Sequence, residues 1–176
     1  YILIDCGTPE GYVQLKENVE KVGVSPAAIK KIYGTHGHYD HVGAAYLWKK
    51  EYGTKLLLHE ADAEQVEQGN SVKTSAVLLY GTEFHPCKVD SFLKEGDRYE
   101  AEGLAMEIIH TPGHTPGGCC YYMEKEGVLF SGDTLFQASV GRSDFPGGSA
   151  SELVRSVKEK LLALPDETHV YPGHMD

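Results

Sequence analysis

The chain has 176 residues, of which 41% are hydrophobic, and a formal net charge of -10. This length predicts one domain, residues 1–176, with its own core. The negative charge, without a basic run to offset it, argues against nucleic acid as a partner. No apolar stretch reaches the roughly 18 residues of a membrane span, and the first residues lack a signal-peptide pattern. We therefore expect a soluble protein that does not contact a membrane.

Strands and helices are expected to alternate in the first half of the chain. Apolar runs, turn residues and the Ser25-Pro26 helix start define these elements. In chain order they are a strand at 1–5, a mixed segment at 10–22, a short helix after Pro26, a strand at 32–34, a helix at 42–52, a strand at 55–59 and a helix at 61–68.

The second half is richer in strands. After an irregular stretch at 80–97, the pattern predicts strands at 104–111, 118–125 and 127–131, a helix from Ser151 to Leu164 that Pro165 ends, and a strand at 169–171. This mixture predicts an α/β fold and is consistent with helices packed outside two sheets. Four cysteines without a C-x-x-C spacing are expected to be reduced, core-filling thiols, which predicts a cytoplasmic protein.

The densest cluster of histidines follows the predicted strand at 32–34. His36, His38, Asp40 and His41 form an H-x-H-x-D-H run. In an extended loop, His36 and His38 project to the same side, where their imidazoles can bind one divalent ion. Asp40 and His41, turning into the next helix, are placed to face a second ion. We therefore interpret the run as a metal-binding loop rather than a solvated surface loop.

Three further segments carry candidate ligands. His114 lies in a Pro/Gly-rich loop whose turns can aim one side chain at a fixed point, Asp133 ends an apolar strand, and His174 follows the last strand through a Pro-Gly turn. His110 is either a residue that orients a ligand or an ordinary one, and the latter is favoured. The remaining histidines are read as ordinary residues: His59, His85 and His169.

Together, H-x-H-x-D-H, G-H-T-P-G, S-G-D-T and Y-P-G-H resemble the metal-binding motifs of the metallo-β-lactamase superfamily, over almost the whole chain. The resemblance implies a four-layer αββα sandwich and a two-metal hydrolase. It also implies the ligands: His36, His38 and His114 for the first ion, Asp40, His41 and His174 for the second, and Asp133 between them.

Asp133 and the following G-R-S-D-F segment are similar to the short glyoxalase II-like branch. That branch implies hydrolysis of S-2-hydroxyacylglutathione or a similar small thioester by a metal-bridging hydroxide. Zinc is favoured as the metal, with iron and manganese compatible with the donors. Asp40 could also hold the hydroxide as a catalytic residue. Arg142 either contacts a substrate carboxylate or pairs with an acid such as Asp144, and the pairing is favoured.

Two alternatives to the thioesterase remain open. One is a mononuclear iron dioxygenase acting on glutathione persulfide, which the same G-R-S-D-F segment resembles. The other is a non-catalytic relative or a hydrolase of another ester or lactone. The first residue falls inside what should be the second or third strand of the fold, so we also expect a chain trimmed at its N-terminus.

Overall fold

The computed structural model describes residues 1–101 and 103–174. Two compact units make up the chain: the first consists of Tyr1–Leu58 and Ala63–Phe92, and the second of His59–Asp62 and the chain from Leu93 onward. Each unit contains one sheet, and each is described separately below. The expectation of a single domain stays a prediction.

The first sheet has the strand order β1-β2-β3-β4. Its strands are β1 (Ile2–Ile4), β2 (Lys31–Tyr33), β3 (Lys55–His59) and β4 (Ser91–Leu93). β1 pairs in parallel with β2, and β2 with β3, with Ile32 opposite both Leu3 and Leu56. The apolar β3 is buried from its second residue onward, as expected for an inner parallel strand.

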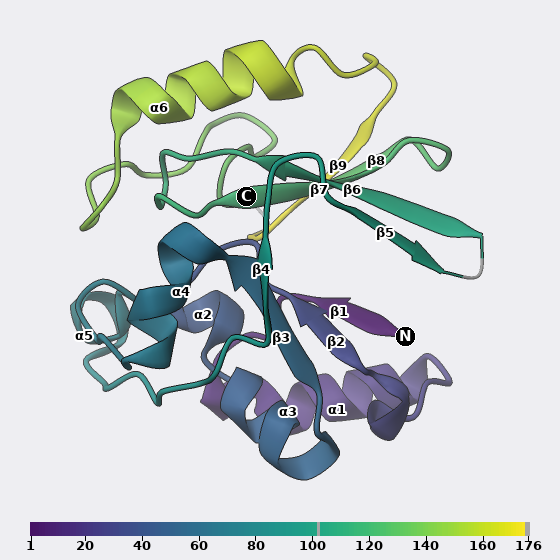
Figure 1. Cartoon of the computed structure of the whole chain (residues 1–176), viewed down its shortest axis with the longest axis vertical. Coiled ribbons are helices and arrows are strands. Elements are labelled where there is room, and N and C mark those ends of the chain that lie inside the picture. Colours follow the sequence, from purple (N-terminus) through teal and green to yellow (C-terminus); the bar gives the residue numbers. More distant parts are fainter. Residues whose placement is uncertain (102, 175–176) are drawn as a thin grey trace. The chain divides into compact units, whose positions relative to one another are not determined.

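The helices of the first part of the chain are short and lie between the strands. They are η1 (Pro9–Gly11), α1 (Tyr12–Lys21), η2 (Pro26–Ala28), α2 (Tyr39–Val42), α3 (Ala45–Tyr52), α4 (Glu60–Glu67) and α5 (Ala76–Tyr80). Figure 1 shows α1 and α3 side by side against the sheet. The helix expected at 42–52 starts earlier and is divided at Gly43, where a Cβ would lie 2.3 Å from the Tyr39 carbonyl oxygen.

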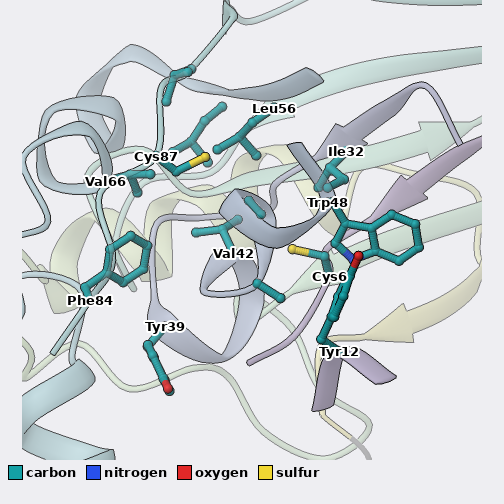
Figure 2. Close-up of a cluster of buried hydrophobic side chains, with 14 of the residues drawn as sticks. Cys6, Tyr12, Ile32, Tyr39, Val42, Trp48, Leu56, Val66, Phe84 and Cys87 are labelled. Atoms are coloured by element: carbon teal, nitrogen blue, oxygen red, sulfur yellow. The ribbon is translucent and has the colours of Figure 1, made fainter. Parts of the chain in front are cut away.

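A cluster of buried apolar side chains fills the space between these helices and the sheet (Figure 2). Trp48 of α3 is fully buried and meets the Tyr12 ring edge to face, with centroids 5.5 Å apart. Cys6 and Cys87 belong to this cluster as free, buried thiols. Gly53 ends α3 in the left-handed conformation (φ 66°), and its N–H caps the Lys49 carbonyl.

The second sheet has the order β5-β6-β7-β8-β9. Its strands are β5 (Arg98–Ala101), β6 (Leu104–His110), β7 (Cys119–Met123), β8 (Val128–Gly132) and β9 (His169–Pro172). All neighbours are antiparallel except β8 and β9, which are parallel.

One long helical segment accompanies the second sheet. α6 (Ala150–Arg155) continues as a π-helical turn, η3 (Ser156–Leu161). Leu161 of η3 packs with Ile109, Cys120 and Leu129 of the strands. In the described residues the structure also has elements that the sequence pattern did not predict, among them α1 within the segment expected to be mixed, and α5, β4 and β5. None of the helices in the described residues has the length and apolar character that crossing a membrane requires.

Candidate metal centre

The loop that carries the H-x-H-x-D-H run connects β2 to α2. At its start, a Cβ at Gly34 would lie 2.8 Å from Leu58 Cδ1 and 2.9 Å from Val42 Cγ1, so a side chain there would have to displace these two buried side chains. His38 has an extended backbone and occupies the N-cap position of α2. The rings of His36 and His38 are 4.7 Å apart between centroids, and those of His36 and His41 are 4.1 Å apart. The loop therefore brings three buried imidazoles together within the first unit.

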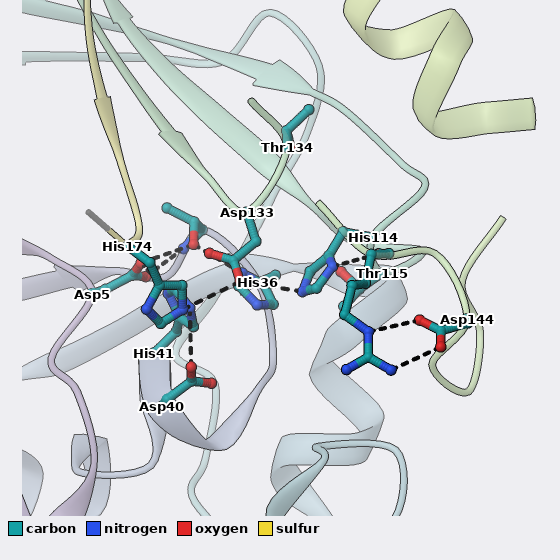
Figure 3. Close-up of polar contacts among 12 residues, drawn as sticks. Asp5, His36, Asp40, His41, His114, Thr115, Asp133, Thr134, Asp144 and His174 are labelled. Atoms are coloured by element: carbon teal, nitrogen blue, oxygen red, sulfur yellow. Dashed lines mark hydrogen bonds and ion pairs between the residues drawn. The ribbon is translucent and has the colours of Figure 1, made fainter. Parts of the chain in front are cut away.

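Asp5, which directly follows β1, forms hydrogen bonds with Thr35 and His41 of this segment (Figure 3). Its Oδ1 accepts the Thr35 backbone N–H at 2.7 Å. Its Oδ2 accepts the Thr35 hydroxyl at 2.8 Å and is 2.7 Å from His41 Nδ1. Asp5 adopts a left-handed backbone (φ 58°), which is unfavourable for a residue with a side chain. The strain persists because these bonds fix the carboxylate in place.

The hydrogen bonds of Asp5 set the tautomers of two histidines. An ionised carboxylate only accepts, so His41 must donate through Nδ1–H. Thr35 gives its single hydroxyl hydrogen to Asp5, so its oxygen must accept from His36 Nδ1, 3.0 Å away. In both rings the lone pair then lies on Nε2. Imidazoles that bind metals are oriented in this manner.

Asp40 lies in the first turn of α2, beside His41. Its side chain is largely buried, and Asp40 Oδ2 is 3.6 Å from His41 Nε2. This separation exceeds the usual hydrogen-bond range of about 2.7–3.2 Å. Two ligand atoms that each lie about 2.1 Å from one ion at the tetrahedral angle are about 3.4 Å apart. The Asp40–His41 spacing therefore suits two ligands of one ion.

The donors of the second unit are His114, Asp133 and His174. Asp133 Oδ2 lies 3.5 Å from His114 Nε2 and 3.4 Å from His174 Nε2 (Figure 3). Both spacings again match the separation of two ligands on a common ion better than a hydrogen bond. One carboxylate placed at this distance from two imidazoles has the geometry needed to bridge two ions.

His114 is also oriented by the backbone. The Arg142 carbonyl oxygen lies 2.7 Å from His114 Nδ1, and because a carbonyl only accepts, the ring donates there and carries its lone pair on Nε2. A Cβ at Gly141 would lie 1.7 Å from the Asp133 carbonyl oxygen and 3.3 Å from His114 Nδ1. Glycine is thus required where the 139–148 loop approaches the two donors.

The donor set therefore fits a transition metal. Each of the seven predicted ligands belongs to a group of side chains whose donor atoms could hold a metal ion. Imidazole nitrogens together with carboxylate oxygens suit zinc, iron or manganese. Which ion each residue binds stays a prediction at this point.

Arg142 makes the acidic contact favoured in the sequence interpretation. Its guanidinium binds both Asp144 oxygens, at 2.9 and 2.8 Å, and covers the Phe145 ring at 4.4 Å. This pairing holds the pKa of the Asp144 carboxyl below its usual value. Both side chains remain more than half exposed. A role for Arg142 in substrate binding stays a prediction.

Among the described residues, the remaining histidines do not belong to any of the groups that could hold a metal ion. His110 Nε2 lies 2.9 Å from the Pro116 carbonyl oxygen, and because a carbonyl only accepts, the ring donates there. His59 stacks on His110, with centroids 3.9 Å apart and planes within 9°. His85 stacks in the same way on Tyr46, and His169 is the first residue of β9.

Sequence reasoning missed Asp5 and Thr35. A signal for Asp5 existed: it ends a strand that pairs in parallel with β2, the strand that leads into the histidine loop. Carboxyl ends of adjacent parallel strands meet at one sheet edge.

Comparison with known proteins places these residues in a family. The sequence profile described as "Metallo-beta-lactamase superfamily" matches residues 1–174. An uncharacterised protein of Aquifex aeolicus is 40% identical over 82% of this chain and 67% of its own length. Hydroxyacylglutathione hydrolase GloC of Haemophilus influenzae is 33% identical over 92% of this chain and 74% of its own.

Solved structures agree. The BLEG-1 B3 metallo-beta-lactamase is 31% identical, with a TM-score of 0.85 over 99% of this chain and 81% of that one. TTHA1623, solved in a di-iron-bound form, is 34% identical, with a TM-score of 0.82 over 98% of this chain and 81% of that one. The predicted α/β fold of two sheets with helices is thereby confirmed.

Proposed function

Because the chain belongs to the metallo-beta-lactamase superfamily, it is a metallo-hydrolase whose fold implies a dinuclear metal site, and we propose that it hydrolyses small thioesters. The substrate class is S-2-hydroxyacylglutathione or a similar small thioester. The observation that carries the proposal is the spacing of Asp133 Oδ2, 3.5 Å from His114 Nε2 and 3.4 Å from His174 Nε2. That spacing suits a carboxylate shared by two ions.

The proposed ligands divide into two sets. When metal is bound, His36, His38 and His114 would hold the first ion, Asp40, His41 and His174 would hold the second, and Asp133 would be shared between them. Zinc is the proposed metal on the donor types. Iron is the alternative, since TTHA1623, a relative in structure, was solved with two irons.

Two divalent ions, when bound, lower the pKa of a shared water toward neutrality and polarise a carbonyl oxygen. The protein's own residues supply the orientation. The Asp5 carboxylate binds Nδ1 of His41 and so places the lone pair of that ring on Nε2, the atom that would bind a metal ion. The Arg142 backbone carbonyl does the same for His114. Asp40, largely buried beside His41, is placed to accept a hydrogen bond from a water that attacks the substrate, and so to hold it for attack.

Thioesters are favoured over oxygen esters because the thiolate is the better leaving group, with a thiol pKa of about 8.5. The relative GloC carries the name of a hydroxyacylglutathione hydrolase. A second candidate is β-lactam hydrolysis, because BLEG-1, a B3 metallo-beta-lactamase, is similar over 99% of this chain.

The test combines metal analysis with a substrate panel. Protein purified without added metal is assayed with S-lactoylglutathione, its oxygen-ester analogue and a chromogenic cephalosporin. An oxygen electrode measures oxygen uptake with glutathione persulfide as the substrate. We expect about two ions per chain and faster cleavage of the thioester. Asp40→Asn should lower turnover by about 100-fold or more, whereas the exposed Asp166→Asn should not.

Three results would reject the proposal. Cephalosporin cleavage without thioester cleavage would indicate a lactamase. Oxygen uptake with one bound iron and no thioester cleavage would indicate a persulfide dioxygenase. Absence of bound metal in protein that is folded and has been given zinc would remove the metal centre altogether.

A further inference from the structure

Asp62 of α4 is a buried carboxylate that the proposed reaction does not use. Its exposed fraction is 0%. A fully buried aspartate is rare, because removing the charge from water is unfavourable unless hydrogen bonds replace the hydration. We propose that Asp62 is a positioning residue, which fixes the loop of His114 and so sets the affinity of the first metal position. The inference rests on the proposed role of His114 as a ligand.

The contacts of Asp62 bracket the loop directly after His114. The Thr115 hydroxyl donates to Oδ2 at 2.6 Å, and the Gly117 backbone N–H donates to Oδ1 at 2.7 Å. Both bonds are short and charge-assisted, and such bonds are roughly twice as strong as neutral ones. One carboxylate thus fixes a side chain and a main-chain group two residues apart.

Gly117 shows how close this approach is. A Cβ at residue 117 would lie 2.6 Å from Asp62 Cγ and 2.7 Å from the Asp62 backbone nitrogen. No side chain fits there, so the loop backbone lies directly against Asp62. The glycine in the Thr115-Pro116-Gly117 segment is explained by this contact rather than by a special backbone angle.

A second contact from the same segment supports the loop. His59 stacks on His110, whose Nε2–H donates to the Pro116 carbonyl at 2.9 Å. Residues 59–62 pack with the second unit although the chain on either side of them belongs to the first. The segment therefore holds the His114 loop at two points.

The two constraints on His114 have different origins. The Arg142 carbonyl sets the direction of the ring through Nδ1, while Asp62 sets the position of the backbone that carries the ring. Metal ligands are sensitive to such supporting contacts, whose loss typically lowers metal affinity 10- to 100-fold. Removing Asp62 should therefore weaken metal binding while the Arg142 contact remains.

The experiment measures metal affinity, not turnover. Apo-protein is titrated with Zn²⁺ against a chromogenic chelator, and with Co²⁺ to follow the ligand-field spectrum. We expect Asp62→Ala to lower the affinity for one ion by about 10- to 100-fold and to change the Co²⁺ spectrum. Asp62→Asn should restore the affinity to within about threefold, because its oxygen can accept from Gly117 and its NH₂ can donate to Thr115.

Asp90→Ala is the matched control. Asp90 Oδ2 accepts the Leu56 backbone N–H at 2.8 Å and pairs with Lys49, so its loss should lower stability while metal affinity stays at the wild-type value. If Asp62→Ala does not fold, Thr115→Val removes one of the two bonds and should lower the affinity about 3- to 10-fold.

Two outcomes would overturn the inference. The first is wild-type affinity for both ions in folded Asp62→Ala, or in Thr115→Val if Asp62→Ala does not fold. Alternatively, Asp90→Ala could weaken binding as much as Asp62→Ala, which would reduce the effect to general stability. Failure of the wild type to bind metal is a different result, because it rejects the proposed function itself.

Discussion

The hydrogen bonds of Asp5 make its replacement by asparagine a test of how the histidine loop is held. The wild-type carboxylate accepts three times, from the Thr35 N–H, the Thr35 hydroxyl and His41 Nδ1. Asparagine has one accepting oxygen and one donating NH₂. If its oxygen stays on the Thr35 N–H, its NH₂ faces His41 Nδ1 and favours the ring tautomer with the proton on Nε2. If the amide is reversed, its NH₂ opposes the Thr35 N–H.

The expected loss in metal affinity is about 10- to 100-fold, typical for removal of a partner that orients a ligand. That range corresponds to about 1.4–2.7 kcal/mol. Folding should suffer less. Asparagine tolerates the left-handed backbone at φ 58° at least as well as aspartate does, so the free energy of unfolding of the apo-protein should fall by no more than about 1–2 kcal/mol.

Zn²⁺ competition titrations and urea unfolding of the apo-protein measure the two quantities separately. The control is Asp97→Asn, in an exposed turn where Oδ2 accepts the Lys94 N–H at 2.9 Å, a bond that asparagine can also make. Wild-type metal affinity in Asp5→Asn would show that the carboxylate does not orient His41, and the tautomer argument would be wrong.

Two further predictions concern groups away from the metal ligands. Burial and the nearby His110 lower the pKa of His59, so protonation favours the unfolded state, and the free energy of unfolding of the apo-protein should fall as the pH drops below about 6.5. Urea unfolding between pH 7.5 and 5 should show a smaller fall for His59→Asn, and an unchanged slope would contradict this. Burial also raises the pKa of all four thiols, to about 11 for Cys87 and Cys120. A thiol reagent at pH 8 should therefore label the native protein slowly, and the unfolded protein at Cys6, Cys87, Cys119 and Cys120. Rapid labelling of the native protein would contradict this prediction.

The candidate ligands could be found from the sequence because each lies in a local pattern. Asp40 and His41 follow His36 and His38 within a few residues, and His114 lies in a Pro/Gly-rich turn. The residues that support them have no such pattern. Asp5 contacts Thr35 across 30 positions, and Asp62 contacts Thr115 across 53. Contacts of this kind depend on strand pairing and on helix packing, which single-sequence periodicity does not determine.

The missed elements have a related cause. β4 is only three residues long and buries Leu93 alone, while the residues of β5 alternate between exposed and partly buried without a clear apolar face. α5 is the opposite case, because most of its apolar side chains are about half exposed. An amphipathic pattern predicts a helix only where one face is buried, and the sequence Ala76–Tyr80 has no polar face.

Residues that break a local rule point to the same loops. Among the described residues, Asp5 and Ser75 are the ones with a side chain and a positive φ. Asp5 bonds to Thr35 and His41, and the carbonyl of Thr74, next to Ser75, accepts the Tyr39 N–H at 2.8 Å. Both strained positions therefore border the loop from His36 to His41. Strain of this kind, about 1–3 kcal/mol at each residue, persists only where the surroundings over-determine it.

Asp62 breaks a different rule, because a carboxylate is buried completely. It too contacts a loop that carries a proposed ligand, through Thr115 and Gly117. Each unit thus contains an aspartate in an unfavourable state next to a loop with proposed ligands: a left-handed backbone at Asp5 and a fully buried charge at Asp62. In each case the hydrogen bonds to the loop offset the unfavourable free energy. Local conflicts in a sequence concentrate at functional sites. Asp5 and Asp62 lie outside the metal-binding motifs, yet their hydrogen bonds reach the loops that carry the proposed ligands.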